Sequence, residues 1–364
     1  MPPSLAPLDF ERLIGLFDDD WLTVFGCFRR SSLALVEGRA SPRPARRPSR
    51  ELIGAARAAL GADVDDAAGA LEFFRRCFRP FRVAPESKAE GFLTGYYEPL
   101  IAASRAETEE FSWPILARPS DLVSLGPSEA PTGFPPGVSG ARRRLDGSLV
   151  PYDDREAIER ERRGAIVWLR DAVEAFLVQV QGSAQVQFPD GRRARLAYDG
   201  RNGHPYASIG RMLIESGKIR ESAMSLAALK AWLRSAGLKE GERGLSLMRR
   251  NRSFVFFRLL EDFDPNIGPV AGAGVALTPL RSIAVDRTLW SYGLPFFIES
   301  EMPWEDVSPQ PFRRLMVAQD TGSAIVGPAR ADIFFGGGDA AGERAGAIRH
   351  PGAFTVLLPR GDEP

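Results

Sequence analysis

Three aspartates in the C-terminal third of the chain have a setting that suits acid–base chemistry. Asp286, Asp320 and Asp332 each lie at the end of a short apolar run, so we expect each carboxyl group at a strand terminus or a barrel rim. A carboxyl group beside apolar side chains has a raised pKa, and it can stay protonated and act as an acid. The alternative is that these aspartates cap turns by accepting hydrogen bonds from backbone N–H groups, which is the commoner role of an isolated aspartate.

One of the three aspartates also matches the active-site sequence of aspartic proteases, Asp-Thr-Gly-Ser, at residues 320–323. That chemistry needs two carboxylates that share a proton. The chain has no second Asp-Thr-Gly and no Asp-Ser-Gly. A homodimer would supply the second carboxylate, but the subunits of such proteases are usually far shorter. The protease interpretation is therefore disfavoured.

A glutamine-rich segment at residues 176–188 has the clearest strand pattern in the chain. Apolar residues alternate with a polar set on the other face: Gln179, Gln181, Ser183, Gln185 and Gln187. Neutral amide and hydroxyl groups can both donate and accept hydrogen bonds, which suits sugar hydroxyl and N-acetyl groups. The alternatives are an ordinary polar face and a ladder of amides packed between strands. We predict a strand here and leave the function of its polar face open.

Helix and strand signals elsewhere predict the elements that position these residues. Residues 10–83 look helical, with Asp18, Asp19 and Asp20 as a cap and a second helix near residues 68–78. Serine caps predict helices near residues 208–216 and 225–235. A turn at residues 189–191 predicts a strand after it that ends near Tyr198. Further strands are expected at the apolar runs 91–100, 254–257, 282–285, 296–298, 315–318 and 354–358. Many short strands separated by turn residues predict a barrel or a sandwich.

Two segments have the composition of loops. Residues 41–50 (SPRPARRPSR) are rich in proline and arginine and predict an exposed, solvated loop. The alternative is that this basic run contacts an anionic partner. Residues 118–154 are rich in proline and glycine, so we expect a surface excursion that adds little to the core.

Composition limits the classes of partner and site. The chain has 364 residues and is 44% hydrophobic, enough for about two domains. It has 47 basic and 47 acidic residues, so no global field favours nucleic acid or an anionic membrane, and a neutral polymer or a small molecule fits better. Two cysteines (Cys27 and Cys77) and two histidines, none in a CxxC pair, argue against a Cys/His zinc site. The cysteines form one disulfide or remain free thiols, and free thiols are slightly favoured.

Targeting signals are not visible in the chain. No apolar run is long enough to span a membrane, and the first residues lack a basic region followed by an apolar stretch. The plain interpretation is a cytoplasmic protein, and the alternative is that an export signal is missing from this version of the chain.

Several short segments, taken in order, resemble one known family. They are residues 95–99 (GYYEP), 178–183 (VQVQGS), 198–206 (YDGRNGHPY), 208–210 (SIG), 253–257 (SFVFF), 285–287 (VDR), 320–327 (DTGSAIVG) and 331–336 (ADIFFG). In this order they resemble the membrane-bound lytic murein transglycosylase A family with its C-terminal 3D domain. The resemblance covers nearly the whole chain, from about residue 10 to residue 358.

The resemblance implies a mainly β fold with helices (α+β). Residues 1–99 and 263–364 would form a double-psi β-barrel with N-terminal helices, the catalytic domain that contains the 3D segment. Residues 100–262 would form an inserted, smaller β-barrel domain that is the other wall of a groove for the glycan strand. The glutamine-rich segment would then belong to the inserted domain.

The resemblance also assigns roles to residues. The catalytic acid of the family aligns with Asp332, and Asp320 would support it through hydrogen bonds or by tuning its pKa. The expected substrate-binding residues are Tyr97, Gln179, Gln181, Gly182, Ser183, Asp286 and Ala324. No metal and no organic cofactor are expected.

The implied activity is that of a peptidoglycan lytic exotransglycosylase, a carbon–oxygen lyase. It would cut the β-1,4 bond between N-acetylmuramic acid and N-acetylglucosamine and leave 1,6-anhydromuramic ends. A glycoside hydrolase on the same fold and a non-catalytic peptidoglycan-binding protein remain alternatives. The expected partner is the glycan strand and not nucleic acid, and the expected protein is a monomer in the periplasm, associated with the outer membrane in many relatives.

Overall fold

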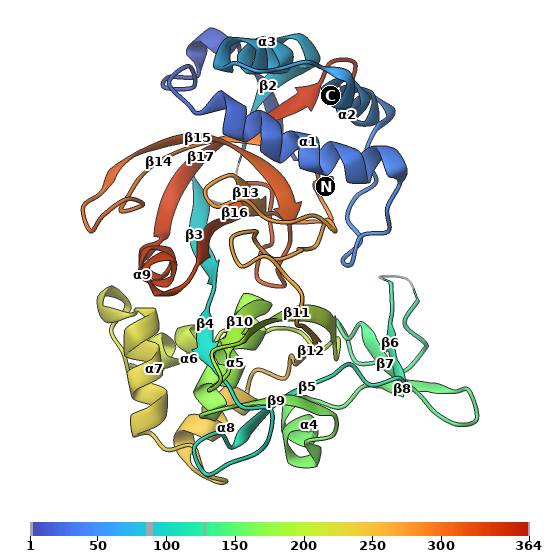
Figure 1. Cartoon of the computed structure of the whole chain (residues 1–364), viewed down its shortest axis with the longest axis vertical. Coiled ribbons are helices and arrows are strands. Elements are labelled where there is room, and N and C mark those ends of the chain that lie inside the picture. The colour runs from blue at the N-terminus through green and yellow to red at the C-terminus, as the bar shows by residue number, and fades with distance from the viewer. Residues whose placement is uncertain (1–2, 85–89, 127–128, 363–364) are drawn as a thin grey trace. The chain divides into compact units, whose positions relative to one another are not determined.

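The computed structural model describes residues 3–84, 90–126 and 129–362, and the chain divides into two compact units. The first unit is Met1–Glu98 together with Asn266–Pro364, and the second is Pro99–Pro265. Figure 1 shows the course of the chain through both units.

The first unit contains a closed barrel. Its six strands follow one another around the ring in the order β3 (Gly91–Glu98), β16 (Arg330–Gly337), β13 (Ser282–Ala284), β15 (Gln310–Asp320), β14 (Pro295–Met302) and β17 (Arg349–Pro359), and β17 pairs with β3 to close the ring. The β3–β16 and β13–β15 pairs are parallel, and the other pairs are antiparallel. The expected barrel is confirmed, and it joins strands from both ends of this unit's sequence.

Helices and two further strands flank this barrel. They are α1 (Trp21–Glu37), α2 (Arg50–Gly61), α3 (Ala67–Cys77), α9 (Asp339–Ala347), the 3-10 turn η1 (Phe10–Arg12), β1 (Leu5–Pro7) and β2 (Phe78–Val83). Asp20 caps α1, because its side chain accepts a hydrogen bond from Thr23 N, and Gly38 ends the helix with φ of 62°. The predicted cap is thus confirmed at Asp20. The prediction of helix throughout residues 10–83 is wrong at β2, which pairs with β17.

The second unit contains a second ring of strands. β4 (Leu100–Ala102), β10 (Ser183–Gln187), β11 (Arg193–Arg201) and β12 (Val255–Leu260) form one sheet, and β5 (Trp113–Leu116) pairs with β9 (Ala165–Leu169). Isolated bridges from Ala117 to Phe257 and from Ser104 to Trp168 join the two sheets at both margins. The second unit therefore also holds a closed, smaller barrel, with Val167, Val186 and Leu196 fully buried in its core.

The remaining elements of the second unit surround this barrel. They are α4 (Arg155–Glu161), α5 (Ala172–Gln181), α6 (Ile209–Glu215), η2 (Glu221–Ala223), α7 (Leu226–Ser235), α8 (Arg243–Arg249) and a sheet of β6 (Leu122–Ser124), β7 (Gly140–Arg143) and β8 (Leu149–Pro151). The helices predicted near residues 208–216 and 225–235 are confirmed as α6 and α7, with Ser208 and Ser225 as their caps. The excursion at residues 118–154 contributes more than expected, because Leu122 and Tyr152 are buried in a core cluster.

The strand predicted at residues 176–188 is wrong in its first half. Residues 172–181 form α5, which Asp171 caps, and Gly182 then adopts φ of 82° and turns the chain into β10. Both sides of α5 are buried: Val178 packs into the barrel core, and Phe176 packs against the helices. A helix that is buried on two sides shows no single apolar stripe, so the alternation of residues was misleading.

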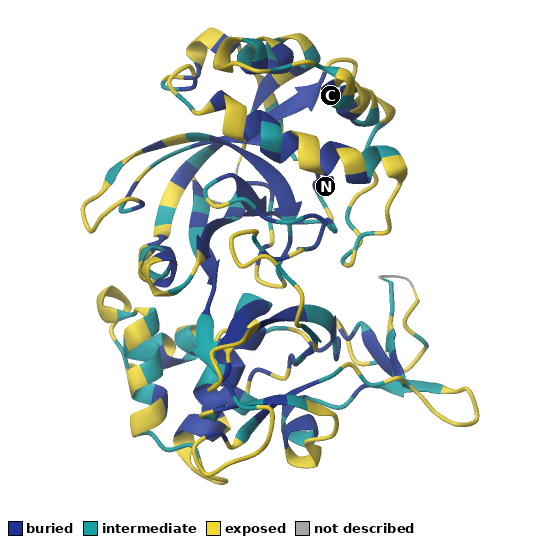
Figure 2. Cartoon of the chain, in the orientation of Figure 1, coloured by how far each residue is buried: buried dark blue, intermediate teal, exposed yellow. Residues whose placement is uncertain are grey.

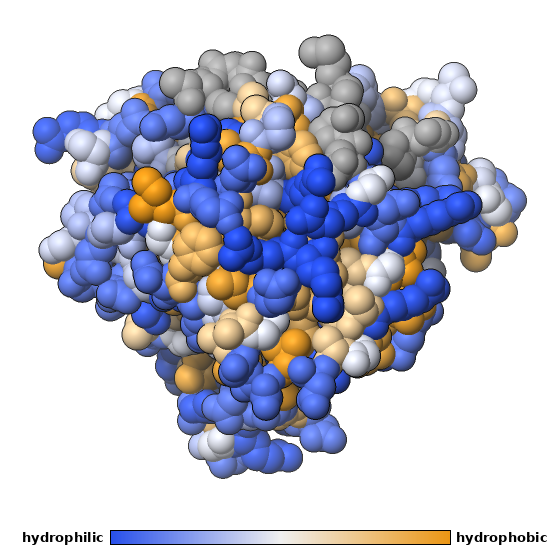
Figure 3. Space-filling model, turned by 90° about the horizontal axis from the view of Figure 1, so that it is seen from above, coloured by the Kyte–Doolittle hydropathy of each residue, from blue (hydrophilic) through white to orange (hydrophobic). Residues whose placement is uncertain are grey.

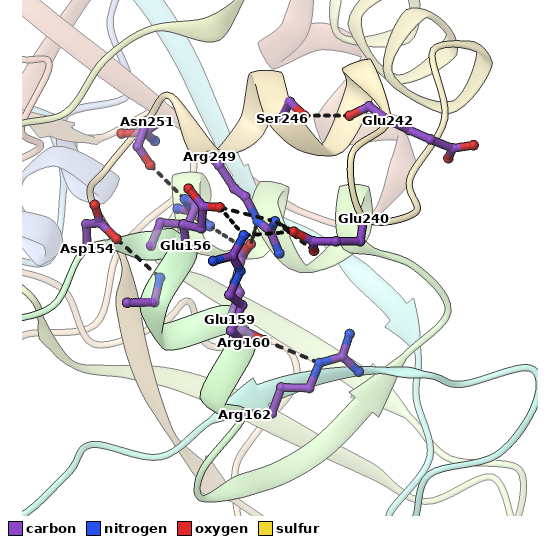
Figure 4. Close-up of polar contacts among 12 residues, drawn as sticks. Asp154, Glu156, Glu159, Arg160, Arg162, Glu240, Glu242, Ser246, Arg249 and Asn251 are labelled. Carbon is purple, nitrogen blue, oxygen red and sulfur yellow. Dashed lines mark hydrogen bonds and ion pairs between the residues drawn. The ribbon is translucent and has the colours of Figure 1, made fainter.

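Ion pairs join α4 and α8 in this unit. Arg155 is 1% exposed and donates to Glu159 at 3.2 Å and to the carbonyl oxygen of Asn251 at 2.8 Å. Arg249 contacts Glu159 at 3.1 Å and Glu240 at 2.8 Å (Figure 4). Burying an arginine charge is costly unless such partners replace water, and the contact of Arg249 with Glu159 links α8 to α4.

Burial follows the two barrels. Figure 2 shows the barrel strands largely buried, while the outer sides of helices such as α7 are exposed. The face drawn in Figure 3 is mostly hydrophilic, with hydrophobic residues in small patches that hydrophilic side chains interrupt. In the described parts of the chain, no helix is long and apolar enough to cross a membrane.

Candidate active site

Asp332 lies within the barrel wall of the first unit. It is the third residue of β16 and stands between Ala284 of β13 and Thr94 of β3. The expectation of a strand terminus or a barrel rim holds for Asp320, the last residue of β15. Asp332 is not at a strand terminus, and it pairs with Ala284, the last residue of β13. The apolar run before Asp332 was misleading because residues 325–329 belong to the preceding loop.

The surroundings of Asp332 favour its protonated form. Thr94 Oγ1 donates to Asp332 Oδ1 at 2.6 Å, and Arg330 Nη2 donates to the same Thr94 oxygen at 2.7 Å. Burial raises the pKa of Asp332 and is the largest influence; the Arg330 charge and the Thr94 hydrogen bond lower it, and the Asp320 charge raises it again. The net effect is a raised pKa, which is what a general acid requires.

Asp320 is held by two donors from different parts of the same unit. The Gly272 backbone N–H donates to Asp320 Oδ1 at 2.9 Å, and Tyr96 Oη donates to Oδ2 at 3.0 Å. Burial and the charges of Asp320 and Asp332 raise the pKa of Tyr96 well above its ordinary value, so its phenol remains a donor. A Cβ atom at position 272 would lie 2.7 Å from Tyr292 Oη, which explains the glycine there.

Asp286 has the contacts of a turn cap. Its Oδ1 accepts hydrogen bonds from Thr288 N at 2.9 Å and from Thr288 Oγ1 at 2.7 Å, and its Oδ2 accepts one from Gly327 N at 2.8 Å. These bonds fix the loop that carries Ala324, which is exposed. The backbone also joins this corner to Asp320, because Val285 N donates to the Asp320 carbonyl oxygen at 3.0 Å.

The other expected substrate-binding residues fall into two groups. Tyr97 is 8% exposed, and its ring packs so closely on α9 that a Cβ atom at Gly342 would lie 2.6 Å from it. In the second unit, Gln179, Gln181 and Gly182 form the end of α5, and Ser183 begins β10. Within the first unit the structure thus brings Asp332, Asp320 and Asp286 together, whereas the glutamines belong to the other unit. Their contacts with substrate stay predictions.

Two neighbours of Asp332 have no signal in the sequence. Thr94 lies opposite Asp332 through the parallel register of β3 and β16, although 238 positions separate the two residues. Arg330 is two residues before Asp332, but only the bond to Thr94 gives it a role at the site.

Among the residues that the structure places, no group of three or more His, Cys, Asp or Glu side chains could hold a metal ion. Cys27 is buried, Cys77 is partly buried, and both are free thiols, so the slightly favoured expectation is confirmed.

Comparison with known proteins identifies the family. Residues 92–258 match the family model described as the MltA specific insert domain, and residues 281–358 match the 3D domain. The crystal structure of a membrane-bound lytic murein transglycosylase from Agrobacterium tumefaciens is 34% identical, covers 98% of both chains and has a TM-score of 0.85. The chain belongs to the membrane-bound lytic murein transglycosylase A (MltA) family. The double-psi barrel with an inserted domain, expected from the resemblance, is thereby confirmed.

Two further comparisons, both with MltA of Escherichia coli, add detail. The membrane-bound lytic murein transglycosylase A of Escherichia coli strain K12 is 33% identical over 270 residues. The match covers 72% of this chain and 64% of that relative, so the chain spans less than two thirds of the relative's length. A crystal structure of E. coli MltA with bound chitohexaose is 26% identical, covers 99% of this chain and 95% of the other, and has a TM-score of 0.65.

Proposed function

We propose that this MltA-family chain is a lytic transglycosylase that cuts the glycan strands of peptidoglycan, with Asp332 as its acid and then its base. The observation that carries the proposal is the partly buried Asp332 carboxyl group, which accepts a hydrogen bond from Thr94 and whose pKa is raised by desolvation. The names of the relatives support the reaction class, and the chitohexaose bound to E. coli MltA supports a β-1,4-linked amino-sugar polymer as ligand.

The reaction needs one carboxyl group. Protonated Asp332 gives its proton to the oxygen that joins N-acetylmuramic acid to N-acetylglucosamine, and the C1–O bond of the muramyl ring breaks. The Asp332 carboxylate then takes the proton of the same sugar's C6 hydroxyl, whose oxygen attacks C1 and closes a 1,6-anhydro ring. Asp332 ends protonated again and no water is consumed. The intramolecular nucleophile replaces the second carboxylate that ordinary glycosidases use.

Thr94 and Asp320 have complementary effects on this cycle. The Thr94 hydroxyl stabilises the carboxylate that forms after proton donation, because a hydrogen bond to an ionised group is strong. The negative charge of Asp320 favours return of the proton to Asp332. One neighbour thus stabilises each protonation state, and the pKa of Asp332 stays within reach of both steps.

The cellular setting follows from the substrate. Peptidoglycan lies outside the inner membrane, so we assign this protein to the periplasm, and we propose that it associates with the outer membrane. The names of its relatives, which are called membrane-bound, support an association with a membrane. We expect it to act as a monomer.

Mass spectrometry of the products from purified murein tests the proposal. Anhydromuramic ends from the wild type, and none from Asp332→Asn, are the expected result. Asp65→Asn is a matched control, since Asp65 is exposed on a loop of the same unit. Reducing ends would support the hydrolase alternative, and binding without products would support the non-catalytic one. Retained activity in Asp332→Asn would refute the role of Asp332.

A further inference from the structure

The arginine-rich segment at residues 41–50, called the basic strap below, is part of the candidate site's surroundings. It contains Arg43, Arg46, Arg47 and Arg50 and no acidic residue. Its sequence predicts a solvated loop, but its backbone is tied to the first unit. Arg43 N donates to Gly272 O at 3.2 Å, and Arg46 N donates to Arg287 O at 2.7 Å. In Figure 1 this blue loop after α1 lies beside the orange segment that contains these partners.

Side chains strengthen this attachment from both directions. Tyr292 Oη donates to the carbonyl oxygen of Arg43 at 2.8 Å, and Ser291 Oγ donates to that of Arg47 at 2.9 Å. Arg287 Nη1 donates to the carbonyl oxygen of Pro44 at 3.2 Å. A loop held at successive carbonyl groups presents its side chains from a fixed backbone, so a ligand does not have to order it.

The strap is close to Asp320 and Asp286, two of the three aspartates of the candidate site. Arg43 Nη1 donates to the carbonyl oxygen of Thr321, the residue after Asp320, at 2.6 Å. Gly272, which accepts from Arg43 N, is also the residue whose N–H donates to Asp320. Arg287 directly follows Asp286. The strap therefore lies along the two loops that follow β13 and β15.

Three guanidinium groups on and beside the strap, those of Arg46, Arg47 and Arg287, have N–H donors available for a ligand. Arg46 and Arg47 are exposed, and Arg287 is partly exposed. Among the described residues, none of the three forms an ion pair with a carboxylate. The Arg46 side chain donates to the carbonyl oxygen of Leu289, and the Arg287 side chain donates to that of Pro44. Each guanidinium has five N–H donors in a planar fork that matches a carboxylate.

We propose that Arg46, Arg47 and Arg287 recognise the carboxylates of the peptide stems on peptidoglycan, and that the strap thereby sets a preference for peptide-bearing over bare glycan strands. This inference rests on the proposed function. The muramyl sugar, at whose C1 Asp332 would act, is also the sugar that carries the peptide. A cationic surface beside Asp320 and Asp286 is consequently within reach of stem carboxylates when that sugar is bound.

The test compares two substrates of matched length, peptide-bearing strands and strands stripped of their stems by an amidase. In Arg46→Gln/Arg47→Gln the KM for peptide-bearing strands should rise about 3- to 20-fold, since exposed charge pairs are each worth a small factor. The KM for bare strands, kcat on both substrates and the melting temperature should not change. Molar salt should remove the difference between variant and wild type, because it screens exposed charges.

The matched control is Arg39→Gln/Arg50→Gln, which removes two nearby charges without touching the tied part of the strap. Arg39 already pairs with Glu37, and Arg50 is the exposed first residue of α2. Amidating the stem carboxylates should abolish the wild type's preference. An equal change in KM on both substrates, or no change on either, would overturn the inference.

Failure of the proposed function gives a different result. In that case the wild type releases reducing ends instead of anhydromuramic ends, or no product, from either substrate. Co-sedimentation with the two kinds of strand then tests the strap alone: the wild type should bind peptide-bearing strands more tightly, and Arg46→Gln/Arg47→Gln should lose that difference. Equal binding of both strands by the wild type would overturn the inference.

Discussion

The hydroxyl group of Thr94 should set the pH range in which Asp332 works. It donates to Asp332 Oδ1 at 2.6 Å and lowers the pKa of that carboxyl group, against the larger effect of burial. Thr94→Val removes the hydroxyl and keeps the shape of the side chain, and valine suits a strand such as β3. The carboxylate loses a stabilising partner, so its pKa should rise further.

The size of the effect follows from the kind of bond. A hydrogen bond to a charged group is worth about 1.5–3 kcal/mol, and one pKa unit corresponds to about 1.4 kcal/mol. We therefore expect an upward shift of about one to two units. Arg330 should not replace the lost hydroxyl, because it also donates to the carbonyl oxygen of Ala331 and its guanidinium lies 5.4 Å from the ring centre of Phe92.

The assay is the pH profile of kcat/KM on purified murein. The alkaline limb reports loss of the essential proton in the free enzyme, so in Thr94→Val this limb should move to higher pH. The maximal rate should fall, since the carboxylate formed during the reaction is less stable. Thr94→Ser keeps the hydroxyl and should follow the wild type. An alkaline limb that does not move in Thr94→Val, or that moves to lower pH, would refute the reasoning.

Three other predictions concern stability and binding. Burial raises the pKa of Asp332, so the ionised carboxylate destabilises the fold as the pH rises through that pKa. At about pH 8, Asp332→Asn should therefore melt at a higher temperature than the wild type. This difference in melting temperature should vanish below the ordinary pKa of an aspartate. Glu159→Ala leaves the buried Arg155 without its carboxylate and should destabilise the second unit by about 3–5 kcal/mol in urea unfolding, whereas Glu156→Ala, in an exposed pair, should cost under about 1 kcal/mol. Gln181→Ala, at the partly exposed end of α5, should weaken the binding of glycan strands in a sedimentation assay and leave the melting temperature unchanged; a lower melting temperature with unchanged binding would show that Gln181 is structural.

Local signals in the sequence predicted much of the secondary structure. The caps at Asp20, Ser208 and Ser225 and the turn before β11 involve residues only a few positions apart, so the sequence contains the whole interaction. The order of the motifs then predicted the family and the barrel fold. The pattern failed at α5, where burial on two sides hides the helical period.

The role of each aspartate was decided by tertiary structure. In the sequence Asp286, Asp320 and Asp332 look alike, each with apolar neighbours and turn residues close by. In the fold, Asp286 accepts three hydrogen bonds, Asp320 is held by Gly272 and Tyr96, and Asp332 is partly buried and accepts a hydrogen bond from Thr94. A pKa depends on desolvation and on charges a few ångströms away, and those neighbours come from strands and loops distant in the chain. The sequence by itself determined which carboxyl groups are candidates for acid–base chemistry, and the barrel decided that Asp332 has the raised pKa that a general acid requires.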